Sequence, residues 1–244
     1  RTQRERARMS ERLEGRGETA EAYWGAHAAE YNEFIVRVVP RYEEQLQRLL
    51  DYAPLRAQRI LELGCGSGNA SLRLAGQWPD AEFTFVDGAP AMLELTRARL
   101  QDRFPAIARS ARFVAERFED LTLEPRTIDV VIASLSLHHV ADVSVVYRQV
   151  APALVSGARL VMLDGVRGAT VAEHDVHMAR WAAFWRQPGN LSDDEIRDVN
   201  DHIAQHDHYR SLPEHFDMLR AAGFRHPDCV WRDGLFALLT ASRA

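Results

Sequence analysis

The sequence predicts an α/β fold: a doubly wound, mostly parallel seven-stranded sheet with a closing antiparallel hairpin, a helical N-terminal preface and a helical insertion late in the chain. Short apolar runs alternate with segments of helical periodicity, which is the order that βαβ units produce. The run Val130-Val-Ile132 is apolar throughout, as in a strand buried on both faces of a sheet. Asp233-Gly234 separates the last two apolar runs and is typical of a two-residue hairpin turn.

The helices are indicated by apolar side chains at helical spacing and by helix-start residues. Residues 19–53 form the helical preface, which Pro40 divides into two amphipathic segments. Pro90 marks the start of a later helix, because its missing N–H would have no partner in the first helical turn. The other expected helices follow Gly68, span 141–155 and 213–222, and occupy 168–212 as two pieces around Pro188-Gly189.

The strands are short apolar runs that are rich in Val, Ile, Leu and Phe and are bounded by turn residues. Because helices separate most of them, we expect parallel pairing with right-handed crossovers. The expected strands are 59–63, 82–87, 111–115, 128–134, 159–163, 228–232 and 235–241.

Length and composition favour a single folded domain. The chain has 244 residues, of which 46% are hydrophobic, and no apolar run approaches the roughly 18 residues that a membrane span needs. We expect residues 1–18 to be a flexible tail and residues 19–244 to be one domain. Two cysteines, Cys65 and Cys229, fit a reducing compartment, so we expect a cytoplasmic protein. The net charge of −5, without a basic stripe, argues against nucleic acid as the main partner.

The most informative stretch is Arg59-Ile-Leu-Glu-Leu-Gly-Cys-Gly-Ser-Gly-Asn69, in which an apolar strand runs into a glycine-rich loop. A glycine at a strand exit can adopt positive φ and lets a ligand approach the backbone with no Cβ in the way. The next apolar run then stops at Asp87. An acid that ends the neighbouring parallel strand can accept hydrogen bonds from a ribose diol. This loop and Asp87 together predict a nucleoside cofactor.

The glycine spacing decides which nucleoside cofactor fits. A dinucleotide fold uses G-x-G-x-x-G, so that a pyrophosphate sits on a helix N-terminus. Here the spacing is G-x-G-x-G, and Asn69 takes the place of the third dinucleotide glycine. Glu62 would repel a pyrophosphate, whereas it suits a ligand with an ammonium and a sulfonium. The stretch Glu62-Leu-Gly-Cys-Gly-Ser-Gly68 resembles the first motif of the class I S-adenosylmethionine (SAM)-dependent methyltransferases, a family with a Rossmann-like fold.

The resemblance implies that SAM is the cofactor and that it binds beyond the carboxyl ends of the strands. Gly64 and Gly66 would bracket its methionine portion, and Asp87 would hold its ribose hydroxyls. Arg117 stands where the family often has an aspartate that reaches the adenine, so we expect this contact to differ. The cofactor-binding residues that the resemblance implies are Tyr42, Glu62, Gly64, Cys65, Gly66, Asp87, Gly88, Met92, Arg117, Phe118 and Ser134.

Within this family, the chain looks most like a branch that includes the carboxy-SAM synthases. The preface carries a matching Pro40-Arg-Tyr42 step, and Tyr42 corresponds to a tyrosine that contacts the cofactor there. That branch binds the added carboxylate with an arginine in the late insertion, where this chain has Asn200, with Arg197 out of register. We therefore favour methyl transfer to a small-molecule acceptor. The alternatives are a carboxy-SAM synthase-like transfer and a SAM-binding protein without catalysis.

Methyl transfer from a sulfonium needs alignment of the nucleophile and exclusion of water more than acid–base help. A base is required only where the acceptor carries a proton that it must lose. His138, which follows the fourth strand together with His139, is the candidate, because histidine titrates nearest to neutrality. The helical cap at 19–53 and the helical insertion at 168–212 are expected to form the acceptor pocket and to act as a lid.

No metal site is expected from the sequence. His174 and His177, and the histidines between 202 and 208, have spacings that could gather imidazoles on a helix. No carboxylate–histidine motif of known metal spacing surrounds them, however. The expected partners are therefore SAM and a small-molecule acceptor, with no membrane contact and with a homodimer left open.

Overall fold

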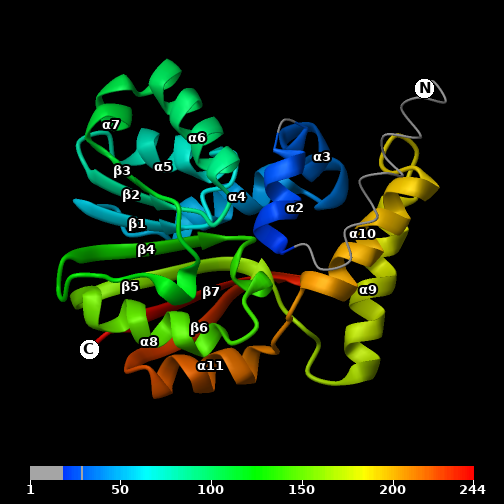
Figure 1. The fold of residues 1–244 in the computed structure, drawn as a ribbon. Helices are drawn as coiled ribbons and strands as arrows, with labels where there is room; N and C mark the ends of the chain where they lie inside the picture. The colour runs from blue at the N-terminus through cyan, green and yellow to red at the C-terminus, as the bar shows by residue number, and fades with distance from the viewer. Residues whose placement is uncertain (1–18, 29) are drawn as a thin grey trace.

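The computed structural model describes residues 19–28 and 30–244 (Figure 1). The flexible tail expected over 1–18 lies outside these residues. Seven described strands form one sheet: β1 (Arg59–Leu63), β2 (Glu82–Val86), β3 (Arg112–Val114), β4 (Ile128–Ser134), β5 (Leu154–Gly165), β6 (Phe224–Asp233) and β7 (Phe236–Arg243).

The strand order is β3-β2-β1-β4-β5-β7-β6, which confirms the predicted α/β fold and its seven-stranded sheet. The pairs from β3 through β5 are parallel, and β7 runs antiparallel to both β5 and β6, so the closing hairpin is also confirmed. Two strands begin earlier than expected. β5 begins at Leu154, beyond a register shift against β4, and β6 begins at Phe224, beyond a shift against β7. Such irregularities extend the pairing without extending the apolar pattern.

The helices match the expected segments, with two differences. The preface contains three helices instead of two, and a short helix starting at Pro105 follows the helix that starts at Pro90. The described helices are α2 (Ala20–His27), α3 (Tyr31–Val38), α4 (Tyr42–Tyr52), α5 (Asn69–Gln77), α6 (Pro90–Arg103), α7 (Pro105–Ser110), α8 (Val143–Ala153), α9 (Val171–Trp185), α10 (Asp193–His206) and α11 (Leu212–Ala221).

The sheet is covered on both faces, so it separates two apolar clusters. Ile60 and Leu61 are neighbours on β1 but belong to different clusters, because successive side chains of a strand point to opposite faces. Helices α4 to α7 pack on the first face, and α8 and α11 pack on the second (Figure 1). This arrangement explains why the middle of β4, Val130 to Ile132, is apolar throughout.

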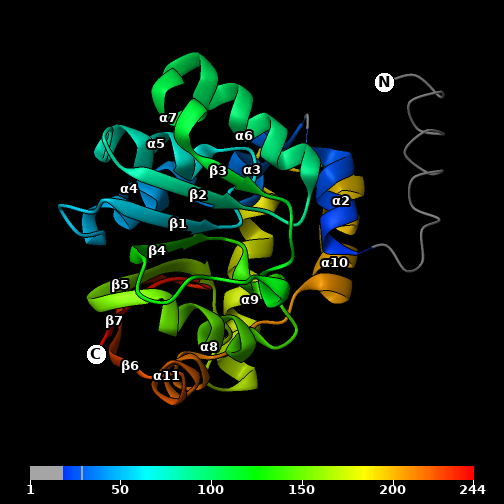
Figure 2. The ribbon, with the colours of Figure 1, turned by 60° about the vertical axis from the view of Figure 1, so that its left-hand side comes forward.

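Helices α2, α3, α9 and α10 gather beyond one end of the sheet in both views (Figures 1 and 2). They lie at the carboxyl ends of the parallel strands, because residues of these helices share cavities with Asp87 and Leu135, which follow β2 and β4. This edge is where ligands bind in open α/β sheets. Among the described helices, none combines the length and the apolar character that crossing a lipid bilayer requires.

Candidate functional site

The loop between β1 and α5 depends on its glycines for two different reasons. Gly64 adopts φ 74°, and a Cβ placed on it would lie 2.2 Å from the Cβ of Ser136, so this position has no room for a side chain. Gly66 adopts φ 52°, and a Cβ there would meet nothing within 4 Å. Gly64 is therefore required by packing, whereas Gly66 keeps the backbone open on the side of a cavity.

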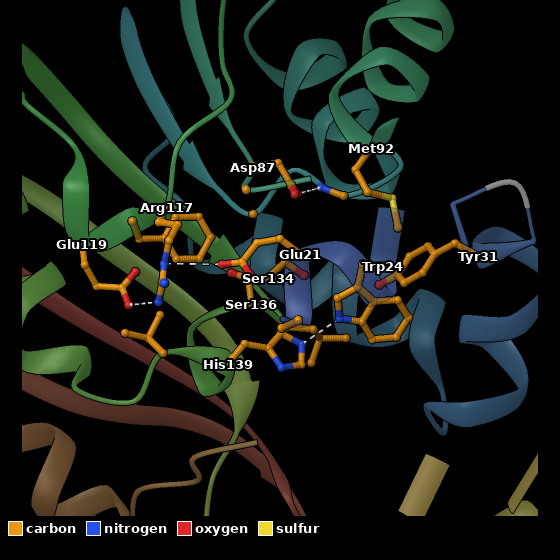
Figure 3. Close-up of a pocket in the computed structure, with 17 residues that line it drawn as sticks. Glu21, Trp24, Tyr31, Asp87, Met92, Arg117, Glu119, Ser134, Ser136 and His139 are labelled. Carbon is orange, nitrogen blue, oxygen red and sulfur yellow. Dashed lines mark hydrogen bonds and ion pairs between the residues drawn. The ribbon is translucent and has the colours of Figure 1, made fainter. Parts of the chain in front are cut away.

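Asp87 is fixed in place by this same loop. Its Oδ2 accepts a hydrogen bond from the Gly66 N–H at 2.8 Å (Figure 3). Its Oδ1 accepts one from the Ala89 N–H at 2.9 Å. Burial raises the pKa of Asp87, although these two hydrogen bonds act to lower it. Each carboxylate oxygen has two lone pairs, so both keep capacity to accept from a ligand hydroxyl.

A cavity of about 730 Å³, including its open mouth, lies against this loop, and we call it the glycine-loop cavity (Figure 3). Helix α2 covers it. Ala20, Glu21 and Trp24 of α2 line it, and a Cβ on Gly88 would come within 2.4 Å of the Glu21 side chain. Most residues with an expected cofactor role also line it, namely Gly64, Gly66, Asp87, Gly88, Met92, Arg117, Phe118 and Ser134.

Three residues with an expected cofactor role do not line this cavity. Glu62 is fully buried beneath the loop, where its Oε2 accepts a hydrogen bond from the Ser71 hydroxyl at 2.7 Å. Its Oε1 has no hydrogen-bond partner, and burial raises the pKa of Glu62 to about 8. Tyr42 is buried in the core with its hydroxyl accepting from Asn69 Nδ2 at 3.2 Å, and Cys65 is buried in the same core. These residues support the loop from behind.

Arg117 reaches the rim of the cavity, where it is held by two acids. It lies 3.6 Å from Glu21 and 3.0 Å from Glu119 (Figure 3). The pairing with Glu21 joins the loop after β3 to α2. The sequence does not identify Glu21 or Glu119 as partners of Arg117, because both ion pairs depend on how the fold places these side chains.

A second cavity of about 570 Å³, including its open mouth, lies beside the first, and we call it the aromatic cavity. Most of its wall is apolar and comes from α2, α3, α9 and α10. Trp181 lines it, and the Trp181 and Trp185 indoles both donate hydrogen bonds to the Val38 carbonyl, at 2.7 and 3.0 Å. Trp185 does not line the cavity and belongs to the core. No arginine is among the described residues that line the aromatic cavity.

The two cavities share four wall residues: Trp24, Tyr31, Leu135 and His139. The rings of Trp24 and Tyr31 meet edge to face with centroids 5.3 Å apart (Figure 3). The Trp24 indole N–H donates to His139 Nε2 at 3.2 Å. The two cavities are therefore adjacent, and these four residues border both of them.

His138, the expected catalytic residue, lines the aromatic cavity and not the glycine-loop cavity. Its Nδ1 is hydrogen-bonded to Asp164 Oδ1, and the Leu137 and His138 N–H groups donate to Asp164 Oδ2 at 2.9 and 3.1 Å. Although burial opposes the charged form, the carboxylates of Asp164 and Asp207 raise the pKa of His138 to about 9.

The polar end of the aromatic cavity is a cluster of His138, His139, His202 and Asp207, which we call the imidazole cluster. Asp207 Oδ1 lies 3.1 Å from His139 Nδ1, 3.7 Å from His202 Nε2 and 3.8 Å from His138 Nε2. Burial lowers the pKa of His202 to about 3, and burial and the neighbouring His138 lower the pKa of His139. Although burial opposes the charged form, the pKa of Asp207 is lowered to about 2 by the nearby histidines and the Tyr209 hydroxyl.

The imidazole cluster joins three distant parts of the chain, so helical spacing does not reveal it. The potential metal-ligating atoms of His138, His139 and Asp207 all lie within 4.8 Å of one another. Of the histidines weighed from spacing, only His202 lines the same cavity among the described residues. The sequence does contain one indication of this cluster, which is Asp164, directly before Gly165 at the carboxyl end of β5. Because β5 pairs with β4, an acid at this position lies near His138, which follows β4.

Comparison with protein families matches residues 60–157 to a family described as a methyltransferase domain. Trans-aconitate 2-methyltransferase of Methylobacterium radiotolerans is 43% identical over 86 residues, covering 33% of each chain. Carboxy-S-adenosyl-L-methionine synthase of Desulforapulum autotrophicum is 26% identical over 209 residues, covering 84% of this chain and 83% of that one. The match to the first relative thus spans about a third of its length.

Among solved structures, the fold is similar to that of a SAM-dependent methyltransferase from Thermotoga maritima. The TM-score is 0.63 at 14% sequence identity, and the match covers 91% of this chain and 98% of the other. This likeness extends over the preface and the late insertion as well as the sheet.

Proposed function

We propose that this chain, as a class I SAM-dependent methyltransferase, transfers the SAM methyl group to a small, apolar acceptor held in the aromatic cavity. The observation that carries the proposal is the shared wall of Trp24, Tyr31, Leu135 and His139. A cofactor in the glycine-loop cavity and an acceptor in the aromatic cavity would meet there. In-line transfer requires such adjacent and oriented sites.

The residues of the glycine-loop cavity fit SAM. Asp87 is held by two backbone N–H groups and faces the cavity, as a group that accepts hydrogen bonds from ribose hydroxyls must do. Gly66 leaves its side of the backbone open, and Met92 and Phe118 supply apolar contact surface. SAM, when bound, supplies a methyl group that its sulfonium already activates. The protein then has to orient the acceptor and keep water out.

The lining of the aromatic cavity indicates the class of acceptor. An acceptor with several carboxylates, such as trans-aconitate, needs cationic side chains to offset its charge. No arginine lines the cavity among the described residues, and the carboxylates of Asp164 and Asp207 already hold the charged form of His138, whose pKa is about 9. A neutral acceptor with an aromatic or aliphatic body and a hydroxyl or amine nucleophile fits better. His138 would receive the proton that such a nucleophile loses only after giving up its own.

A carboxy-SAM synthase-like transfer is the second candidate, and the arginines count against it. Arg197 is exposed on α10 and pairs with Asp194, away from both cavities. Asn200, at the matching position, is also exposed and donates to the Ile196 carbonyl. Arg117 is the one arginine among the described residues of the glycine-loop cavity, and Glu21 and Glu119 already engage it. An added carboxylate would therefore lack a free cation.

Labelled SAM and matched acceptor pairs test the proposal. The protein is incubated with methyl-labelled SAM and a panel in which each aryl alcohol or amine is paired with the corresponding carboxylic acid. We expect label to transfer to neutral members and not to their acids. Preferential labelling of the acids would contradict the proposed acceptor class. A cofactor that gains the mass of a carboxylate in native mass spectrometry would favour the second candidate, and SAM binding without any transfer would favour a non-catalytic protein.

A further inference from the structure

The imidazole cluster contains buried polar atoms that the protein itself leaves without hydrogen-bond partners. They are Asp207 Oδ1, both ring nitrogens of His202, and Nδ1 of His139. The Asp207 side chain is only 3% exposed, and His202 is 8% exposed. Unpaired buried donors and acceptors cost free energy, so a group of them pointing at one another calls for a ligand that satisfies them together.

The distances between these atoms match those between ligands of one metal ion. A tetrahedral ion bound at about 2.0–2.1 Å holds its ligand atoms about 3.3 Å apart. Here Asp207 Oδ1 lies 3.1 Å from His139 Nδ1, 3.8 Å from His138 Nε2 and 3.7 Å from His202 Nε2. The closest of these pairs, His139 Nδ1 and Asp207 Oδ1, is an ion-pair contact, which a bound ion would replace.

The surroundings of the cluster also suit a cation. Asp164 holds His138 through Nδ1 and so turns Nε2 toward Asp207. A carboxylate behind a ligating imidazole is the usual outer support of protein metal sites. Asp164 and Asp207 are two buried carboxylates, at 1% exposure and 3% side-chain exposure respectively. A divalent ion would neutralise both.

We propose that His138 Nε2, His139 Nδ1 and Asp207 Oδ1, which all lie within 4.8 Å of one another, form a binding site for a divalent transition-metal ion. Imidazole nitrogens combined with one carboxylate oxygen suit Zn²⁺, Fe²⁺ or Co²⁺ and not Mg²⁺ or Ca²⁺, which take oxygen ligands. All three residues line the aromatic cavity, so the ion would face the acceptor. There it would polarise a coordinated hydroxyl for methylation. This last role rests on the proposed function, whereas ion binding does not.

Trp24 supplies a built-in reporter of the ion. Its indole N–H donates to His139 Nε2 at 3.2 Å, which requires a lone pair on that nitrogen. An imidazole that binds a metal through Nδ1 carries its proton on Nε2, so the indole has to release His139 when the ion binds. The Trp24 environment should therefore change with occupancy.

The test uses the full chain, freed of metal by dialysis against a chelator, with Co²⁺ and Zn²⁺ as probes. We expect one Co²⁺ per chain, the visible absorption of a four-coordinate ion, displacement by Zn²⁺, and an accompanying change in tryptophan emission. His139→Ala and Asp207→Asn should each weaken binding at least tenfold, because the first removes a ligand nitrogen and the second removes the negative charge of a ligand. The matched control is His174→Ala/His177→Ala, which removes two histidines of α9 outside the cluster and should bind like the wild type.

SAM binding by calorimetry shows in parallel that each variant is folded, and it separates failure of this proposal from failure of the proposed function. Equal Co²⁺ affinity of the wild type and the folded cluster variants would overturn the metal site, even if SAM binds and methyl transfer occurs. So would loss of Co²⁺ binding in the α9 control, or an octahedral cobalt spectrum that does not change with the cluster. If the cluster variants fail to fold, the milder His139→Gln, which removes one imidazole ligand and keeps a polar side chain, must weaken Co²⁺ binding for the site to stand.

Discussion

Asp87 and Gly66 are joined by a hydrogen bond of 2.8 Å from the Gly66 N–H to Asp87 Oδ2, across 21 residues of chain. The carboxylate at the end of β2 and the glycine loop after β1 therefore form one rigid unit. A ligand that hydrogen-bonds to Asp87 also lies against the open backbone at Gly66, where a Cβ would meet nothing within 4 Å. This pairing sets the position that we propose for SAM.

The two loop glycines should respond differently to an added methyl group. Gly64→Ala should destabilise the fold, because its Cβ would lie 2.2 Å from that of Ser136. Gly66→Ala has the space for its Cβ and should fold, although with some strain from its positive φ, while binding SAM more weakly. Thermal unfolding and calorimetry measure the two effects. A Gly66→Ala variant that binds SAM like the wild type would remove Gly66 from the site.

Glu62 should make stability depend on pH in the direction opposite to most acids. Burial raises its pKa to about 8 in the folded state, whereas an unfolded chain has the ordinary glutamate pKa of 4.5. Between these two values the folded state keeps a proton that the unfolded state loses. The free energy of unfolding should therefore fall as pH rises from about 4.5 to about 8, by at most about 1.4 kcal/mol per pH unit.

Urea unfolding at a series of pH values measures this slope. Glu62→Gln keeps the shape of the side chain without a titrating proton, so its stability should vary less over the same range. Glu94→Gln, which alters an exposed acid on α6, is the matched control and should keep the wild-type slope. If Glu62→Gln also keeps the wild-type slope, Glu62 is ionised in the fold.

Helix α2 should become protected when the cofactor binds. None of its described residues is buried, yet Glu21 and Trp24 cover the glycine-loop cavity. Helices without buried side chains open more easily than core helices, and a ligand beneath them adds contacts. Hydrogen exchange should slow in 20–27 on addition of S-adenosylhomocysteine and change little in α4, which has four buried residues. Protection confined to residues 60–120 would contradict a lid role for α2.

The insertion at 168–212 is anchored more firmly than the preface helix. Trp181 and Trp185 of α9 are buried and hydrogen-bond to Val38, and Ile196 and Val199 of α10 are buried as well. Because both segments are rich in aromatic residues, the sequence predicts that they act together as one lid. The structure shows that α9 and α10 have buried side chains and α2 has none, so hydrogen exchange in the insertion should slow less than in α2 when S-adenosylhomocysteine is added.

Local patterns predict most of the fold and the loop side of the site. The glycine loop is a contiguous motif, and Asp87 ends the strand next to it, so both can be recognised from the sequence. The seven strands can be placed from apolar runs alone. The structure also shows why Glu62 and Tyr42 are harder to place. The sequence shows that each lies near the loop, but the direction of a side chain depends on packing against α4 and α5.

The acceptor side cannot be predicted in the same way, because its parts meet only through tertiary contacts. Asp207 follows α10, His138 follows β4, and Asp164 lies near the end of β5, so no window of sequence contains the imidazole cluster. The shared wall likewise depends on α2 folding back over the sheet edge. Helical spacing draws attention to His174 and His177, which lie outside the cluster.

Calorimetric titration of SAM into the wild type, Asp87→Ala and Asp87→Asn tests most directly whether Asp87 holds the cofactor. Charge-assisted hydrogen bonds to ribose hydroxyls are worth about 1.5–3 kcal/mol each. We therefore predict at least tenfold weaker binding for Asp87→Ala, an intermediate loss for Asp87→Asn, and no competing affinity for NAD. Equal SAM affinity in the wild type and Asp87→Ala, or tighter binding of NAD than of SAM, would contradict the account.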